Sequence, residues 1–566
     1  MHIKKTQGIE SNVLIIGGGL AGLMAALEAT KITSGVTLVC KKKAGLSGNT
    51  LVSGAGLASF LFNTHDSQDL YFHDTVKGGK YINDSQLVKI LANQSEAALM
   101  DLEALGVNYI RINNQLLRKL NPGHSTSRTV YCTSDPREYL IRGISLLRPL
   151  MEQVKKSRIR IIENTPVVRL EKKGTTVFGA WGLNINHEEL VWFPAKSIVL
   201  AAGGGARLFA ENNNTSEMTG DAYNLALTVG AVLRDMEFIQ FYPTMLQRPV
   251  KMPLTTSLFA DGAVLCDQNG NRFMTKYAPI EQEMATRDKM AQAIFLEIRS
   301  GDSNETEIFV DCTQVPKEKL ETNYRFLYDF LVQRNIDMLK EWLPVRPTTH
   351  FFMGGVKIDQ YSQTNLKGLF AAGECTGGVH GANRLATNAL TEATVFGKIA
   401  GKSAAQFALN YDYYQIEPPE FPIPIVEKGK LAAEEVKNLL HETMWKNASI
   451  IRSHNTLSQA LTDIKKCRSI LYSAALNNLR DLSIHLEIEG MCLTAETIVR
   501  SALFRKESRG SHFREDMPQE DDHWLGSVET RLQNSKIEQS FVPSELSKSE
   551  KSFLSQTQSI NQLSSR

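Results

Sequence analysis

The sequence predicts an α/β fold, in which a doubly wound dinucleotide-binding domain carries an inserted α+β capping domain and is followed by a helical C-terminal domain. Three strand-like apolar runs end in glycines, at residues 13–19, 197–205 and 369–373. After residue 428 glycines become scarce, and apolar residues recur every three or four positions, as in amphipathic helices. The three distant runs are expected to build one domain.

The order of these patterns predicts four regions. Residues 1–235 and 350–425 form the discontinuous dinucleotide-binding domain, and residues 236–349, which mix charged helices with short strands such as EIFVDC, form the capping domain. Residues 426–535 form the helical C-terminal domain. Residues 536–566 are rich in Ser, Gln and Lys and are expected to be a disordered tail.

Composition and charge exclude several classes of function. Among the 566 residues, 42% are hydrophobic and 22% are charged, as is usual for globular proteins. The formal net charge of +2 gives no large field of one sign, so no nucleic-acid partner is expected. The N-terminus is polar and the first apolar run is broken by glycines, so we expect neither a signal peptide nor a transmembrane segment, and a cytoplasmic protein.

The seven cysteines are widely spaced and include no Cys-x-x-Cys pair. This usage is typical of a reducing compartment, and it excludes iron–sulfur clusters and c-type haem from this polypeptide. Any such centre would belong to another chain, so an iron–sulfur or other electron-transfer subunit is a candidate partner. No metal site is predicted.

Gly17, Gly19 and Gly22 form a G-x-G-x-x-G turn between a strand and a helix. Glycines there let backbone amides at the positive end of the helix approach a pyrophosphate. NAD-binding proteins usually place an acidic residue at the end of the second strand, but here that strand ends Val39-Cys40-Lys41. This strand end therefore departs from the usual NAD-binding pattern.

At these residues the chain resembles the flavoprotein family of fumarate reductase, L-aspartate oxidase and the succinate dehydrogenase flavoprotein, the FAD-dependent oxidoreductase 2 type. Members often carry Ser-Lys where this chain has Cys40-Lys41. Further agreement lies in AGLSGNTLVSGAGLAS, VLAAGGGARLF, MTGDAYNLAL and GLFAAGECTGGVHGANRLATNALTEATVFG. The resemblance runs from Ser11 to Asp522 and implies an FAD-binding fold.

The resemblance also implies which residues contact FAD. Glu374 would bind ribitol or ribose hydroxyls, and Asp221 would lie near the flavin, with an acidic surface turn as the alternative. Asn49 stands where membrane-bound relatives attach FAD through a histidine, and because an asparagine cannot be that nucleophile, FAD is expected to be non-covalent. The predicted cofactor residues are Gly17, Gly19, Gly22, Lys41, Ser47, Asn49, Thr50, Gly56, Val167, Ala202, Gly203, Asp221, Glu374, Asn388, Ala389 and Leu390.

Three residues match the family's catalytic positions. Arg384 would clamp a substrate carboxylate, for which a planar guanidinium is suited, with a structural salt bridge as the alternative. His350 would donate a hydrogen bond to the substrate. Arg287 would deliver the proton opposite the hydride, and its alternative role is a surface ion pair with Asp288.

The substrate-binding positions depart from the family pattern. Tyr242 replaces a carboxylate-binding histidine. Its phenol can donate one hydrogen bond to a substrate but carries no positive charge at neutral pH, so a second carboxylate would be held less strongly. Thr255 is kept, but Thr256 replaces the glutamate that relays protons to the catalytic arginine in dicarboxylate enzymes. Leu258 and Phe259 replace polar residues, which indicates either a less polar pocket or core positions in the cap.

Near the C-terminus, Arg509, His512 and Arg514 suggest a structural ion-pair network, with an anion site as the alternative. Taken together, the resemblance implies an FAD-dependent oxidoreductase of the fumarate reductase or succinate dehydrogenase type that transfers hydride between flavin N5 and a small carboxylic acid. The alternatives are an L-aspartate oxidase-like enzyme and a flavin electron-transfer subunit of a larger redox complex.

Overall fold

The apolar stretch Val13–Ile16 is at most 5% exposed and lies at the centre of the largest sheet. The computed structural model describes residues 4–5, 8–61, 65–300, 306–411, 417–424 and 433–544. Strands from distant segments pair in parallel with one another around this stretch, and an antiparallel extension continues beyond them. Across the sheet the order is β10 (Val167–Lys173), β11 (Thr176–Asn184), β12 (Glu189–Leu200), β2 (Ser11–Ile16), β3 (Val36–Val39) and β9 (Arg160–Ile162), with β1 (Lys4–Lys5) and β20 (Leu369–Ala371) also paired to β12.

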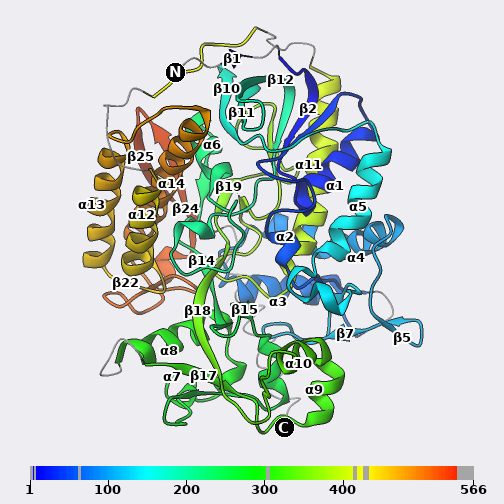
Figure 1. The fold of residues 1–566 in the computed structure, drawn as a ribbon, viewed down its shortest axis with the longest axis vertical. Coiled ribbons are helices and arrows are strands. Elements are labelled where there is room, and N and C mark those ends of the chain that lie inside the picture. The colour runs from blue at the N-terminus through cyan, green and yellow to red at the C-terminus, as the bar shows by residue number, and fades with distance from the viewer. Residues whose placement is uncertain are drawn as a thin grey trace.

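Helices cover this sheet, and the first of them starts at the glycine turn. Figure 1 shows α1 and α11 side by side against the parallel strands, with α5 and α4 beyond them. The predicted α/β fold with a discontinuous sheet is therefore confirmed. The helices of this part are α1 (Leu20–Thr30), α2 (Asn49–Val52), α3 (Gln68–Gly78), α4 (Ser85–Ala104), α5 (Ile144–Lys156), α6 (Asp221–Val229) and α11 (Asn388–Leu409).

The cap has a sheet and a core of its own. Its antiparallel order is β15 (Met252–Pro253), β14 (Ile239–Leu246), β18 (Leu343–Phe352), β17 (Ile308–Asp311) and β16 (Val264–Asp267). In Figure 1, β14 and β18 run from the main body into this lower part. Leu258 and Phe259 belong to the cap's apolar core, which decides between the two sequence-based interpretations in favour of core positions. The cap helices are α7 (Met274–Tyr277), α8 (Arg287–Ser300), α9 (Lys317–Asn323) and α10 (Arg325–Val332).

Three helices form the bundle expected near the C-terminus, namely α12 (Ala433–Ala448), α13 (His454–Leu471) and α14 (Leu479–Phe504) (Figure 1). Two expectations were wrong here. Residues after the bundle form the hairpin β24 (Gly526–Gln533) and β25 (Lys536–Pro543), so the domain does not stay helical and the tail does not start at residue 536. Pairing with β24 orders the polar segment because it satisfies the backbone groups of the strand. Residues 545–566 lie outside the described part.

The hairpin pairs with strands from residues 233–377 and so joins the C-terminal region to the middle of the sequence in a second sheet. Its order is β21 (Thr376–Gly377), β19 (Gly355–Lys357), β13 (Leu233–Arg234), β24 and β25. Smaller sheets join β4 (Gly56–Ala58), β8 (Thr129–Tyr131) and β7 (Arg118–Lys119), then β5 (Arg111–Ile112) and β6 (Gln115–Leu116), and β22 (Ile451–Arg452) and β23 (Phe513–Arg514). None of the helices in the described ranges has the length and hydrophobicity that crossing a bilayer requires.

A buried ion-pair network holds the same junction. Arg505 Nε donates to Glu237 Oε1 at 2.6 Å and its Nη1 donates to Glu507 at 3.0 Å, with both partners fully buried. Arg509 donates to Glu507 at 2.8 Å, and Arg514 to the carboxylate of Asp516. His512 Nδ1 lies 2.8 Å from Arg452 Nη1. The structural network expected for Arg509, His512 and Arg514 is thus confirmed in place of an anion site.

Candidate active site

A cavity of about 950 Å³ lies between the α/β domain and the cap. It extends from the glycine turn after β2, past the loop of Asn49, to Arg384 and the cap residue Tyr242. This volume is at the upper end of the range of about 300–1,000 Å³ that is usual for ligand pockets. The enclosed space is therefore large enough for a cofactor and a small substrate together.

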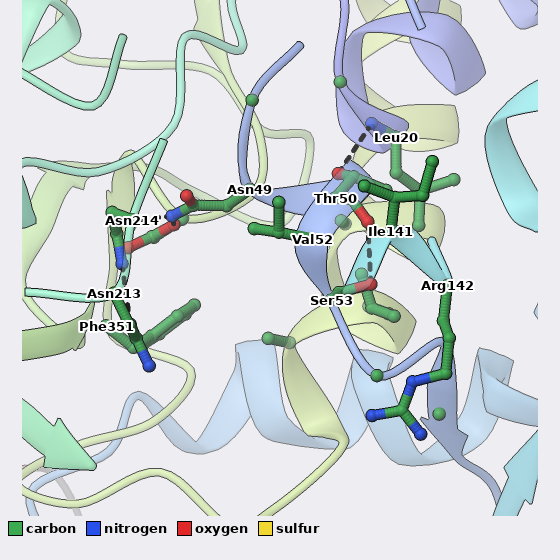
Figure 2. Close-up of a pocket in the computed structure, with 18 of the residues that line it drawn as sticks. Leu20, Asn49, Thr50, Val52, Ser53, Ile141, Arg142, Asn213, Asn214 and Phe351 are labelled. Atoms are coloured by element: carbon green, nitrogen blue, oxygen red, sulfur yellow. Dashed lines mark hydrogen bonds between the residues drawn. The ribbon is translucent and has the colours of Figure 1, made fainter. Parts of the chain in front are cut away.

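The glycine turn presents the start of α1 to the cavity. Gly17 and Gly19 line it, and the N-cap residue Gly19 has no side chain that could cap the helix, so amides of the first turn other than that of Leu20 are available to an anion. Leu20 N donates to Thr50 Oγ1 at 3.2 Å, a bond drawn in Figure 2. Gly22 does not line the cavity. A Cβ atom there would lie 1.9 Å from Gly17 O, so this glycine permits the helix to pack against the turn.

The loop after the second strand places Asn49 between two polar groups. Asn49 Nδ2 donates to Asn214 Oδ1 at 2.5 Å and to Glu374 Oε2 at 3.3 Å, while its Oδ1 accepts from Thr215 N at 3.2 Å. Figure 2 shows the side chains of Asn49 and Asn214 pointing toward each other. The amide therefore acts as a hydrogen-bonding brace at this side of the pocket.

Glu374 presents a carboxyl group to the cavity. Its Oε1 accepts a hydrogen bond from Phe352 N at 3.3 Å. Burial raises the pKa of Glu374 to about 7, against the hydrogen bonds from Phe352 and Asn49. A carboxyl that titrates near neutrality can accept from, or donate to, sugar hydroxyls, which fits the role expected for Glu374.

Lys41 and Asp221 meet at the cavity wall. Lys41 Nζ lies 2.9 Å from Asp221 Oδ2 and 2.6 Å from Glu487 Oε2. Burial disfavours its charge, but the two carboxylates hold the pKa of Lys41 above its usual value. Asp221 is therefore an ion-pair partner of Lys41 rather than an acid on a surface turn. Glu487 comes from α14, and no local sequence motif identified it.

Most of the predicted cofactor residues line the cavity, and two do not. Besides Gly22, the exception is Asn388, whose side chain is fully buried at the start of α11. Its Oδ1 accepts from Tyr71 at 3.0 Å and its Nδ2 donates to Thr75 at 3.3 Å. The predicted residues that line it are Gly17, Gly19, Lys41, Ser47, Asn49, Thr50, Gly56, Val167, Ala202, Gly203, Asp221, Glu374, Ala389 and Leu390.

Arg384 and Arg287 converge on one acceptor at the cap end of the cavity. Arg384 Nη2 donates to Gln240 Oε1 at 2.8 Å, and Arg287 Nη1 donates to the same oxygen at 3.5 Å. Burial lowers the pKa of Arg384 to about 9, and the neighbouring charge of Arg287 acts in the same direction. Gln240 was not predicted, because no motif marks it.

Neither guanidinium has a carboxylate partner within 4.0 Å in the part of the chain that the structure describes. Asp288, the alternative partner of Arg287, is instead buried and accepts from Asn383 at 3.0 Å. Arg384 Nε is buried and has no hydrogen-bond partner among the described residues. A buried and a half-buried positive charge, with no carboxylate partner among the described residues, are suited to binding an anion.

His350 lies at the same end and is oriented by Asn213. Its Nδ1 is 3.0 Å from Asn213 Oδ1, and because that oxygen also accepts from Asn214 Nδ2 at 3.2 Å, the imidazole nitrogen is assigned as the donor. Burial lowers the pKa of His350, and the charges of Arg384 and Arg287 add to this. The neutral ring then presents Nε2 as an acceptor. The expected donation to substrate requires the charged form, which a bound carboxylate would stabilise.

Tyr242 is packed among these residues. Its hydroxyl donates to Leu254 O at 2.8 Å, so that hydrogen is not free for a substrate, contrary to the expectation from the sequence. The Arg287 guanidinium lies 4.7 Å from the ring centroid, and the ring contacts His350 edge to face at 5.2 Å. Thr255 lines the cavity and its hydroxyl lies 2.7 Å from that of Ser257. Tyr242 therefore supports Arg287 rather than binding an anion itself.

Comparison with known proteins decides the family. The FAD binding domain family matches residues 12–390, and the fumarate reductase flavoprotein C-terminal family matches residues 437–552. The chain belongs to the fumarate reductase and succinate dehydrogenase flavoprotein family. This flavoprotein is 37% identical to one subunit of the fumarate reductase (CoM/CoB) of Methanothermobacter marburgensis, over 94% of this chain and 98% of that one. It is 31% identical to L-aspartate oxidase of a Nostoc species, over 91% and 92%.

Solved structures agree with this family. The flavoprotein superposes on the FrdA chain of quinol fumarate reductase from Escherichia coli with a TM-score of 0.86 and 26% identity, covering 96% of this chain and 98% of that one. It is thus an FAD-dependent oxidoreductase, as the sequence predicted. The residues present fit the cofactor, since amides of the first turn of α1, the buried carboxyl group of Glu374 and a continuous cavity are all in place. When bound, FAD supplies a carrier that accepts or donates a hydride.

Proposed function

We propose that this flavoprotein holds FAD without a covalent bond and interconverts a small carboxylic acid and its unsaturated counterpart, as a fumarate reductase-like enzyme. The observation that supports the proposal most is the pair Arg384 and Arg287, which share Gln240 and have no carboxylate partner among the described residues. A carboxylated substrate would supply the missing negative charge.

Each of the three residues has a distinct part in this proposal. Arg384 binds the substrate carboxylate through its two nitrogens, and the buried surroundings strengthen that pair. His350, in its charged form, donates from Nε2 to the same substrate. Arg287 holds the proton that is delivered to, or taken from, the carbon opposite the hydride. Because Thr256 carries no carboxyl, the proton reaches Arg287 by a route other than a glutamate at that position.

The cap contributes by excluding water. Residues Thr255–Ser257 and Asn323–Leu327 of the cap line the same cavity as the glycine turn, so the substrate would be enclosed between the two domains. Desolvation there strengthens the interaction of the guanidiniums with a bound carboxylate. The cap thus contributes to catalysis as well as forming one wall of the cavity.

Asn49 supports the non-covalent attachment. Its amide is engaged with Asn214 and Glu374, and an amide is not a nucleophile. Acid precipitation of the purified protein tests this directly. Yellow FAD in the supernatant supports the proposal, whereas flavin that stays with the precipitate contradicts it.

An L-aspartate oxidase-like activity is the second candidate. It is favoured by the 31% identity to L-aspartate oxidase of a Nostoc species, and by Asn49, which aspartate oxidases share in effect because they too lack the histidine that attaches FAD. Steady-state assays with fumarate, succinate and L-aspartate separate the two. Turnover of aspartate alone would replace the first proposal by the second.

We further propose that the chain works in the cytoplasm with an iron–sulfur or other electron-transfer subunit. All seven cysteines are free and buried, which suits a reducing compartment. Co-purification with a cysteine-rich polypeptide supports this partner, and full activity of the isolated chain with a soluble electron donor of the cell would contradict it.

A further inference from the structure

A third guanidinium, that of Arg142, faces the cavity. Arg142 lies in the turn between the short helix η1 (Pro136–Ile141) and α5, and it is half-buried. Its guanidinium stacks 4.6 Å from the ring centroid of Tyr139. Its Nε atom is buried without a hydrogen-bond partner in the described ranges. The side chain thus brings to the cavity wall a positive charge that has no carboxylate partner among the described residues.

Arg142 lies on the wall of the pocket opposite the residues that contact His350 and Arg384. A Cβ atom on Gly54 would lie 3.8 Å from Arg142 Nη2, so the guanidinium sits against the loop between α2 and β4. In Figure 2, Arg142 lies across the pocket from Asn213 and Phe351. Asn213 orients His350, and Phe351 lies beneath the guanidinium of Arg384, 4.3 Å from it. Arg142 and the residues that contact Arg384 and His350 therefore lie on opposite walls of the pocket.

The charge of Arg142 also acts on Tyr242, the position where related dicarboxylate enzymes carry a histidine. Burial raises the pKa of the Tyr242 phenol, and the nearby positive charges of Arg287, Arg142 and Arg384 oppose that rise. All three guanidiniums are thus within electrostatic reach of Tyr242, where dicarboxylate enzymes resembling this chain carry a histidine. The charge missing at residue 242 is supplied from a different element.

We propose that Arg142 binds the second carboxylate of a dicarboxylic substrate while Arg384 binds the first. This inference rests on the proposed function and adds its substrate class. A guanidinium forms paired hydrogen bonds with a carboxylate, and stacking on Tyr139 holds its plane in place. Leu258 and Phe259 lie in the cap core rather than on the cavity wall, so they provide no apolar subsite for a monocarboxylic acid.

The test compares two acids that differ by one carboxylate. Fumarate and crotonate are assayed with the FAD-loaded full chain as wild type, Arg142→Gln and Arg142→Lys. Arg142→Gln should raise the KM for fumarate about 30-fold or more and change that for crotonate less than about threefold. Arg142→Lys should recover part of the loss because it keeps the charge. Arg137→Gln, which removes an 88% exposed arginine paired with Asp135, is the matched control and should change neither.

A binding readout keeps this test separate from that of the proposed function. Malonate and propionate are titrated against the flavin absorbance of the same proteins, and only the malonate Kd should weaken in Arg142→Gln. If the wild type turns over neither acid but malonate binding depends on Arg142, the proposed function fails and this inference stands. The role of Arg142 would be overturned if Arg142→Gln weakened the binding of malonate and propionate equally, or weakened neither. It would also be overturned if both Arg142→Gln and Arg142→Lys failed to retain FAD.

Discussion

Arg384 lies in a buried pocket where its nearest partner is a neutral amide. A guanidinium in that setting gains most from a bound anion, because Gln240 Oε1 accepts from both Arg384 and Arg287 and Arg384 Nε has no hydrogen-bond partner among the described residues. This arrangement favours acids at the substrate end. If one of the two arginines is removed, the negative charge of the substrate carboxylate is only partly balanced.

Replacing Arg384 by glutamine should therefore lower kcat/KM for fumarate by about 100-fold to 1,000-fold, the usual cost of losing one partner of a buried charge pair. Steady-state kinetics with the FAD-loaded protein measure this. Arg148→Gln removes a 57% exposed arginine that is paired with Glu138 and serves as the control. A loss of less than tenfold in Arg384→Gln would show that the carboxylate binds elsewhere.

Glu374 gives the site a pH-dependent contribution to stability. Burial raises its pKa from 4.5 to about 7. The folded chain therefore holds this proton more tightly than the unfolded chain does, so the side chain contributes fully below pH about 4.5 and the contribution is lost as the pH rises through about 7. In the FAD-free protein, Glu374→Gln should flatten the fall in Tm between pH 5 and 8, an effect on the order of 2 kcal/mol. Identical pH profiles for the two proteins would contradict this assignment.

Several site residues could be predicted from sequence because they lie in local motifs. Arg384, His350 and Arg287 each sit in a short matching segment, and all three line the cavity. Gln240, which contacts both arginines, and Arg142, which lines the cavity, were missed because chain packing that no spacing encodes brings them to the site. Neither Tyr242 nor a neutral His350 has the free hydrogen that donation to a substrate needs, so His350 keeps its expected role only in the charged form. Their hydrogens are used by Leu254 and Asn213, which are distant in the sequence.

At the scale of elements, the junction between β2 and α1 decides whether the cofactor can approach. Gly22 faces the turn and not the cavity, and a Cβ atom there would come within 1.9 Å of a backbone oxygen. Gly22→Ala should therefore push α1 away from the turn, lowering FAD content and Tm together. Gly174→Ala is the control, since its Cβ atom meets nothing within 4 Å and only its φ of +62° is unfavourable, at about 1 kcal/mol. Normal FAD affinity in Gly22→Ala would show that the close packing is not needed.

The elements themselves were predictable to different degrees. The buried strand, glycine turn and helix at residues 11–30 follow from local apolar periodicity. The hairpin of β24 and β25 was not foreseen, because its polar residues resemble a tail until pairing with distant β13 is considered. Local composition does not reveal which distant strand a segment will pair with, so this hairpin could not be predicted from it.

At the scale of the whole molecule, the buried network at Arg505 joins the base of the cap to the C-terminal region. Glu237 precedes β14, while Arg505 follows α14, and their side chains are fully buried. Arg505→Met leaves Glu237 and Glu507 without their shared partner, so we expect a loss of about 3–5 kcal/mol in the free energy of unfolding. Denaturant titration measures it.

The matched comparison is Arg500→Met, which removes a 41% exposed arginine paired with Glu496 and should cost no more than about 1 kcal/mol. Equal losses for the two variants would show that the buried network does not hold the regions together. A separate early transition in Arg505→Met alone would show that the C-terminal region unfolds independently once the network is broken.

The central claim is that the cavity passes a hydride between FAD and a carboxylic acid bound at Arg384. The most direct measurement is to reduce the purified protein with dithionite under anaerobic conditions and follow the flavin absorbance after fumarate is added. Rapid reoxidation in the wild type, together with slow reoxidation in Arg384→Gln, is the predicted result. A reduced flavin that stays reduced with fumarate, or that reoxidises equally fast in both proteins, would contradict the account.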